Sequence, residues 1–141
     1  MSLAVGALLL ALHSFGELAA TLHDGHEVRA VFDYHACTLV SENGGEPGPE
    51  AIGGMAFRSW ELFAPGVVHN PQAYVAASET HLIRHPTRGF VQNYVKVKVF
   101  ADDSVEVNAA YLDPKSLRVV MDETFRCTID HGASFYVDGP G

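Results

Sequence analysis

The sequence predicts an α+β domain that is mostly β, with one N-terminal helix packed on an antiparallel curved sheet or partly closed β-barrel of about six or seven strands. Two observations lead to this prediction. A helical period in the apolar residues gives way after Gly25 to a period of two, which is typical of half-buried strands. Glycines and prolines then separate the apolar runs, where turns belong. A chain of 141 residues is long enough for one domain with a real core.

Composition narrows the class of partner. The chain carries 17 acidic against 9 basic residues, for a formal net charge of −8, and has no run of Lys or Arg. This charge argues against binding to nucleic acid or to anionic membrane surfaces, where cationic patches dominate affinity. Hydrophobic residues make up 48% of the sequence, which is typical of a folded domain.

The segment before the helix is apolar. Residues 2–12 contain no charged side chain, and eleven residues are too few to cross a bilayer core of about 30 Å as a helix. The length fits the apolar part of a secretory signal, although no Lys or Arg precedes it. An apolar first helix packed on the domain is the alternative. We favour a signal-like segment over residues 1–13, a single domain over 14–141, and a secreted protein, extracellular or periplasmic, without stable membrane insertion.

A helix is predicted immediately after this segment. Ser14 and Glu17 form the Ser-x-x-Glu pattern of a capping box. Gly25 is suited to the left-handed position that follows a last helical turn. The apolar residues between them recur on one helix face: Phe15, Leu18, Ala19 and Leu22.

The remaining chain predicts strands. Val28, Ala30 and Phe32 face one way and the polar Arg29 and Asp33 face the other in a first strand that we extend to Cys37. Residues 41–49 are rich in glycine, proline and polar side chains and predict an irregular loop. The other expected strands cover residues 55–63, 74–77 and 80–83 (as two strands or one bent strand), 90–100, 105–111, and a last hairpin of 125–129 and 133–137.

The two cysteines are expected to pair. Cys37 and Cys127 both lie on predicted strands, and export would place them in an oxidising compartment. Two buried free thiols are the alternative, since unpaired cysteine is commonly buried. A bond between them would close a loop over most of the chain and stabilise the fold by roughly 4–5 kcal/mol.

An ordered set of short segments covers about residues 14–137. It consists of the helix with Gly25, the strand ending in Cys37, Ile52-Gly53-Gly54, Thr80-His81-Leu82, Gly89–Tyr94 with Lys96, Asp102-Asp103, and Phe125–Phe135. This set resembles the VirK-like family of small exported proteins. The resemblance implies an exported, β-rich domain with two cysteines. The family has no generally established activity, so the resemblance supplies no catalytic residues.

Motifs for catalysis or metal binding are missing from the sequence. There is no Gly-x-Ser-x-Gly, no phosphate-binding glycine loop and no His-Glu-x-x-His. His81 and His85 are four residues apart, but their segment predicts a strand, and structural zinc generally takes four N or S ligands. We therefore predict no catalytic residue and no metal site. A hydrolytic enzyme is the weakest alternative, with His81 as its best candidate.

A binding function is easier to support. Aromatic residues occur on nearly every predicted strand and are interleaved with polar ones, as expected for a cavity or a subunit interface. We predict a non-enzymatic protein that needs no cofactor and binds a small apolar ligand, such as a lipid or a retinoid-like or carotenoid-like pigment. The alternative is a protein–protein interaction module, as a homo- or hetero-oligomer, acting through a sheet edge or an exposed aromatic patch. The predicted ligand-binding residues are Phe57, Trp60, Gln92, Asn93, Tyr94 and Asn108.

Overall fold

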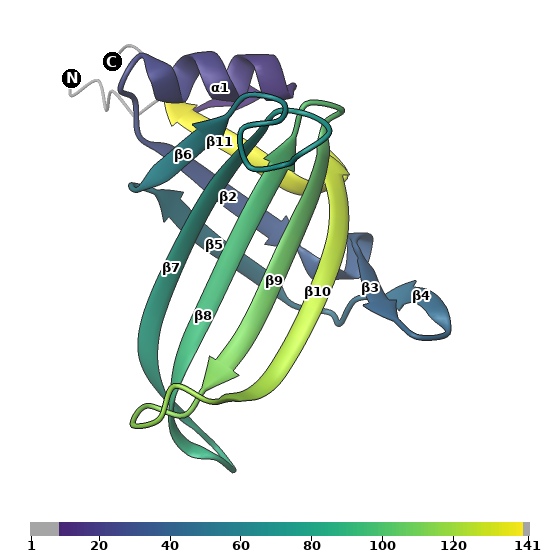
Figure 1. Cartoon of the computed structure of the whole chain (residues 1–141), viewed down its shortest axis with the longest axis vertical. Helices are drawn as coiled ribbons and strands as arrows, with labels where there is room; N and C mark the ends of the chain where they lie inside the picture. The colour runs from purple at the N-terminus through teal and green to yellow at the C-terminus, as the bar shows by residue number, and fades with distance from the viewer. Residues whose placement is uncertain (1–8, 140–141) are drawn as a thin grey trace, which may run out of the picture.

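A computed structural model describes residues 9–139 (Figure 1). It contains one α-helix and one short 3₁₀ helix together with eleven strands over these residues. In chain order the elements are β1 (Leu9–Leu12), α1 (Phe15–His23), β2 (Val28–Asp33), η1 (Tyr34–Ala36), β3 (Thr38–Ser41), β4 (Gly44–Pro47), β5 (Ile52–Phe57), β6 (Trp60–Phe63), β7 (Tyr74–His85), β8 (Gly89–Phe100), β9 (Ser104–Leu112), β10 (Val119–Ile129) and β11 (Gly132–Asp138).

The strands form one curled sheet that closes into a half-barrel. Its strand order is β5-β2-β11-β10-β9-β8-β7-β6, with β1 beside β11 and the β3–β4 hairpin beside β10. The four long strands β7–β10 lie side by side, β2, β5 and β11 cross them at one end, and α1 lies over that end (Figure 1). The predicted α+β architecture, with one helix on a curved and mostly antiparallel sheet, is confirmed.

The core lies where the crossing strands meet the long strands. Val97 and Val99 of β8 and Val105 and Val107 of β9 are buried there, at the alternate positions expected of strands with one face on the core. Three phenylalanines supply the largest fully buried side chains, and Phe135 makes edge-to-face contacts with Phe32 and Phe57 at ring-centroid distances of 6.5 and 5.7 Å.

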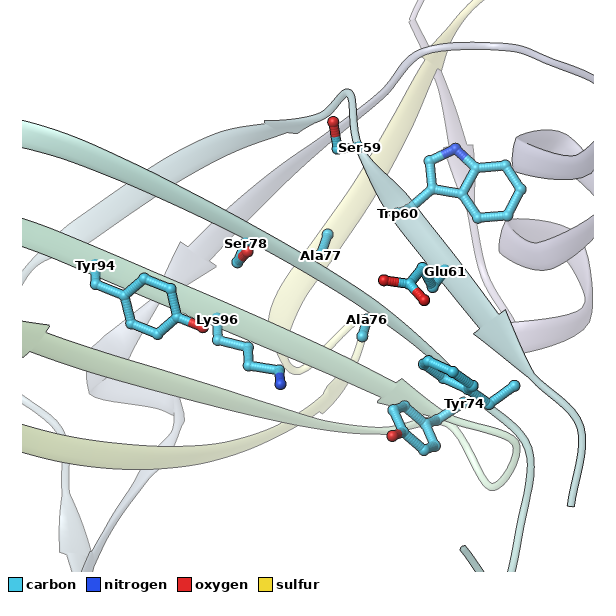
Figure 2. A pocket seen from close by; sticks show the side chains of 10 residues that line it. Ser59, Trp60, Glu61, Tyr74, Ala76, Ala77, Ser78, Tyr94 and Lys96 are labelled. Carbon is cyan, nitrogen blue, oxygen red and sulfur yellow. The ribbon is translucent and has the colours of Figure 1, made fainter. Parts of the chain in front are cut away.

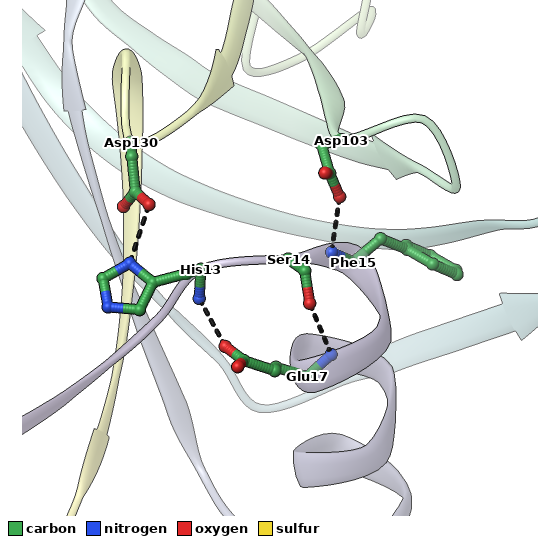
Figure 3. A network of polar contacts seen from close by, with 6 residues as sticks. All are labelled: His13, Ser14, Phe15, Glu17, Asp103 and Asp130. Atoms are coloured by element: carbon green, nitrogen blue, oxygen red, sulfur yellow. Dashed lines mark hydrogen bonds and ion pairs between the residues drawn. The ribbon is translucent and has the colours of Figure 1, made fainter.

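The predicted helix is present and capped. The hydroxyl of Ser14 accepts a hydrogen bond of 3.1 Å from the backbone N–H of Glu17. The carboxylate of Glu17 accepts one of 2.6 Å from the N–H of His13, one residue before the position that a capping box uses (Figure 3). Leu18 and Leu22 are buried, and Gly25 follows the helix with a φ of +88°.

The predicted first strand is shorter than expected. It ends at Asp33, and a 3₁₀ turn over Tyr34–Ala36 comes before Cys37. The chain turns here because its backbone pairs outside β2: the N–H of Tyr34 donates to the carbonyl of Ala51 and the N–H of Gly48 donates to that of Cys37. Cys37 therefore follows a corner, and its position in a strand was wrongly predicted.

The polar stretch at residues 41–49 is not wholly irregular. Thr38–Ser41 and Gly44–Pro47 pair as the short hairpin β3–β4, with Ser41 opposite Gly44. Gly44 has a φ of +104°, which glycine adopts without the steric cost that a side chain would add. The composition therefore predicts the turn correctly but misses the pairing around it.

Residues 55–63 form two strands where one was expected. The chain bends at Arg58-Ser59, so that β5 pairs with β2 while β6 pairs with β7. These two strands are the two ends of the main strand order. The bend carries the chain from one end of the half-barrel to the other. The predicted 74–83 region is the single strand β7, which is twelve residues long.

The last two strands do not form a hairpin. β10 and β11 share only the parallel register pairs Thr128–Gly132 and Ile129–Ala133, and β11 then continues antiparallel to β1 and β2. Asp130 and Gly132 have φ values of +68° and +91° and make this corner. The alternating residues before and after this corner do form strands, but the alternation does not reveal which strand each of them pairs with.

Part of the N-terminal apolar segment belongs to the fold. Leu9–Leu12 forms β1 against β11, and the side chain of Leu12 is only 7% exposed. Residues 1–8 of the predicted signal-like segment lie outside the described residues, whereas the apolar-helix alternative does not hold for Leu9–Leu12. Across residues 9–139 we find no helix with the length and apolarity to cross a membrane.

The predicted disulfide is confirmed. Cys37 and Cys127 are bonded across a separation of 90 residues. The bond joins the corner after β2 to β10 and packs in the core.

Candidate functional site

The half-barrel has a hollow of about 270 Å³ on its concave side, between the crossing strands and the long strands. We call this hollow the interior cavity. Its lining comes from β2, η1 and β5 on one side and from β7 and β8 on the other: Phe32, Tyr34, Gly53, Gly54, Met55, Glu79, His81, Asn93 and Val95.

Gly53 of β5 leaves space for it, whereas the next residue, Gly54, has its side-chain position on the opposite face of the strand. Gly53 faces Phe32 in the register of β2 and β5, and a methyl group at Gly53 would lie 3.1 Å from the ring of Tyr34. Among the described residues, a methyl group at Gly54 would meet only the carbonyl oxygen of Ala30, at 3.4 Å. A strand without side chains here allows the aromatic ring and the backbone to approach closely.

The opposite wall carries polar groups. Glu79 and His81 are two residues apart in β7, so their side chains share a face, and Oε1 of Glu79 lies 3.0 Å from Nε2 of His81. Asn93 of β8 is the register partner of His81, and Val95 is that of Glu79. These four residues form a patch in which a carboxylate, an imidazole and an amide border an aliphatic side chain.

Tyr34 connects the cavity to the core. Its ring centroid lies 4.7 Å from that of Phe125 and 6.3 Å from that of Phe32. Burial raises the pKa of its phenol group above the ordinary value of 10.0. The hydroxyl is therefore neutral near neutral pH and can donate a hydrogen bond.

A second hollow, of about 290 Å³, lies at the end of the long sheet near β6 (Figure 2). We call it the outer groove. Ala76 and Ser78 of β7 lie between Glu61 on one side and Lys96 and Tyr94 on the other. Small side chains thus make its floor, and larger polar ones make its rim.

The structure separates the predicted ligand-binding residues. Asn93 lines the interior cavity, whereas Trp60 and Tyr94 line the outer groove. Phe57 is 1% exposed and packs in the core. Neighbouring residues on a strand point to opposite faces, so Gln92 and Tyr94 cannot share a site with Asn93.

Asn108 has a different environment from the other five. Its amide group donates to the carboxylate of Asp122 at 2.6 Å, to the carbonyl of Glu123 at 3.2 Å and to the hydroxyl of Thr124 at 3.2 Å. These contacts join β9 to β10. The side-chain amide of Asn108 therefore serves to hold these two strands together.

Sequence reasoning missed most of the cavity wall. Glu79, Tyr34 and the pair Gly53-Gly54 were not among the predicted ligand-binding residues. The glycine pair was the available signal, since glycine inside a strand often marks a close approach of backbone or ligand. Within residues 9–139 no group of three or more His, Cys, Asp or Glu side chains is placed to hold a metal ion.

Together these features describe a β-rich half-barrel with a small interior cavity and one disulfide. The profile of the VirK protein family matches residues 11–117, and the chain belongs to this family. A crystal structure of a VirK family protein from Legionella pneumophila superposes with a TM-score of 0.72 at 16% identity, over 89% of this chain and 98% of that one. At this identity the likeness concerns the fold alone. A search among curated proteins finds no match.

Proposed function

We propose that this chain is an exported, non-enzymatic binding protein that holds a small, largely apolar ligand in the interior cavity. The observation that carries the proposal is the mixed wall of that cavity. Phe32, Met55 and Val95 supply apolar surface, and Glu79, His81 and Asn93 supply hydrogen-bonding groups at one side. Ligand sites in proteins commonly combine apolar walls with a few placed polar groups.

The size of the cavity limits the ligand. A volume of about 270 Å³ is near the lower end of the range of roughly 300–1,000 Å³ that is usual for ligand pockets. It accommodates a single ring or a short aliphatic chain. A longer lipid or a carotenoid-like pigment would place the rest of its length outside the cavity, along the concave face of β7–β10.

The proposal that the chain is exported rests on the disulfide between Cys37 and Cys127. Structural disulfides form and persist chiefly in oxidising compartments. Mass spectrometry of the unreduced protein, purified from its natural source, tests this part of the proposal. The mass reports both the disulfide and the N-terminus of the mature chain.

The binding proposal is tested with a neutral, environment-sensitive dye such as Nile red and a pair of glycine variants. Gly53→Ala moves the ring of Tyr34 and narrows the cavity, so the dye should bind several-fold more weakly. Gly54→Ala is the matched control, because its methyl group meets only Ala30 and should leave binding nearly unchanged. Extraction of protein from its natural source, followed by mass spectrometry, should also release a ligand at about one per chain. Equal dye binding by both variants, with nothing extracted, would refute the proposal.

The free part of β7 favours a second candidate, self-association. β6 pairs with Tyr74–Ala77 only, so in the described part of the chain Ser78–His85 has no strand on that side. Leu82, at the centre of this edge, is 58% exposed. Antiparallel pairing of two copies about Leu82 would place Glu79 opposite His85, with complementary charge when the histidine is protonated. Light scattering should then report a dimer that Leu82→Lys dissociates, and a monomeric wild type would exclude this candidate.

A further inference from the structure

We propose that the interior cavity prefers ligands whose polar end is a primary amine or another cationic group, and that it discriminates against carboxylates. This inference rests on the proposed binding function. It adds the chemical class of the ligand's polar end, which the apolar wall does not specify.

The first argument is the charge of the lining. Glu79 supplies a carboxylate, and no lysine or arginine is among the described residues that line the cavity. In β8, Lys96 and Lys98 are separated from the cavity residues Asn93 and Val95 by odd numbers of positions. Strand alternation therefore places both ammonium groups on the opposite face of the sheet. A carboxylate ligand would meet the charge of Glu79 without a permanent cation to offset it.

The second argument is the position of the Glu79 carboxylate. Its side chain is 33% exposed, so water shields it less than a fully solvated group. Its contact with His81 is made through Oε1, and Oε2 makes no other ion pair within the described residues. This second oxygen can accept a charge-assisted hydrogen bond from an ammonium group. Such bonds are stronger than those between neutral groups.

The third argument is the chemistry around that carboxylate. The rings of Phe32 and Tyr34 line the same cavity, and aromatic faces attract cations at short range. The side-chain carbonyl of Asn93 offers a further acceptor. Val95, the register partner of Glu79, provides apolar surface next to the carboxylate for the alkyl part of the ligand.

The experiment compares three probes that share one alkyl chain: octylamine, octanol and octanoate. Each displaces a neutral dye from the full chain at mildly alkaline pH, where histidine side chains are in general neutral. We expect octylamine to displace the dye at a concentration about tenfold lower than octanoate, with octanol between them, because only the amine can donate to the carboxylate of Glu79 a hydrogen bond in which both partners are charged.

Two variants assign the preference to one residue. Glu79→Gln keeps the shape of the side chain and removes its charge, so the advantage of octylamine should disappear while octanol is unaffected. Glu61→Gln is the matched control, because that carboxylate lines the outer groove. It should retain the full preference.

The outcomes separate this inference from the function on which it rests. If the dye and all three probes fail to bind, the proposed binding function fails, and the inference fails with it. If the dye binds and the three probes displace it equally, or octanoate displaces it best, the amine preference is overturned while the binding function stands. The ranking on the wild-type chain decides this even if Glu79→Gln does not fold.

Discussion

Nδ1 of His13 lies 2.7 Å from a carboxylate oxygen of Asp130, across 117 positions of sequence (Figure 3). A second contact lies close by: the backbone N–H of Phe15 donates to the carboxylate of Asp103 at 2.7 Å. Asp130 belongs to the corner between β10 and β11, and Asp103 belongs to the turn between β8 and β9. The start of α1 is therefore held against two turns that are remote in sequence.

The His13–Asp130 contact predicts a pH dependence of stability. The hydrogen bond and the charge of Asp130 raise the pKa of His13 above its ordinary value of 6.5. A raised pKa in the folded state means that the contact stabilises at pH below 6.5 and that this contribution is lost as pH rises through the raised pKa. The stability difference between wild type and His13→Gln should therefore shrink as the pH increases. Urea denaturation from about pH 5 to about pH 9 measures it, and a difference that grows with pH would contradict the prediction.

Strand β1 predicts a contrast between two leucines of the N-terminal segment. Leu12 is 7% exposed in the core, whereas Leu10 is 49% exposed. Leu12→Ala should reduce the free energy of unfolding by about 2–3 kcal/mol, because it leaves a cavity. Leu10→Ala, the control, should cost less than about 1 kcal/mol. Equal effects in chemical denaturation would show that β1 does not pack as described.

The disulfide predicts a large loss of stability when it is removed. Replacing Cys37 and Cys127 together by alanine opens a loop of 90 residues. The chain-entropy relation gives a loss of about 4–5 kcal/mol for a loop of this length. Denaturation of the double variant beside wild type measures the change. A loss below about 1 kcal/mol would mean that the bond adds little to a fold already fixed by its core.

Gly132 predicts a specific steric requirement beside that disulfide. It has a φ of +91°, and a methyl group there would lie 2.6 Å from Sγ of Cys37. Gly66 has a similar φ of +84°, and no atom of residues 9–139 lies within 4 Å of such a methyl group. Gly66→Ala should therefore cost only the backbone strain of about 1–2 kcal/mol. Gly132→Ala should cost clearly more, and equal thermal shifts for the two variants would refute the role of crowding.

Local patterns predicted the elements whose partners are near in sequence. Ser14 and Glu17 predicted the start of the helix, because a cap involves only residues within one turn. The alternation within residues 90–100 and 105–111 predicted β8 and β9 for the same reason, since these two strands are neighbours in sequence and pair with each other. The pattern failed at residues 130–132, where a corner and a hairpin turn use the same kinds of residue.

Local patterns in the chain were enough to predict a β-rich domain with one capped helix and a bond between its two cysteines. They did not predict that Leu9–Leu12 is a strand, that β5 and β6 lie at opposite ends of the main strand order, or that Glu79, Tyr34 and Asn93 line one cavity. These features depend on the curl of the sheet. Alternation along a strand tells which face of the strand a residue occupies. Which strands lie opposite one another across the half-barrel depends on pairings between segments that are distant in sequence.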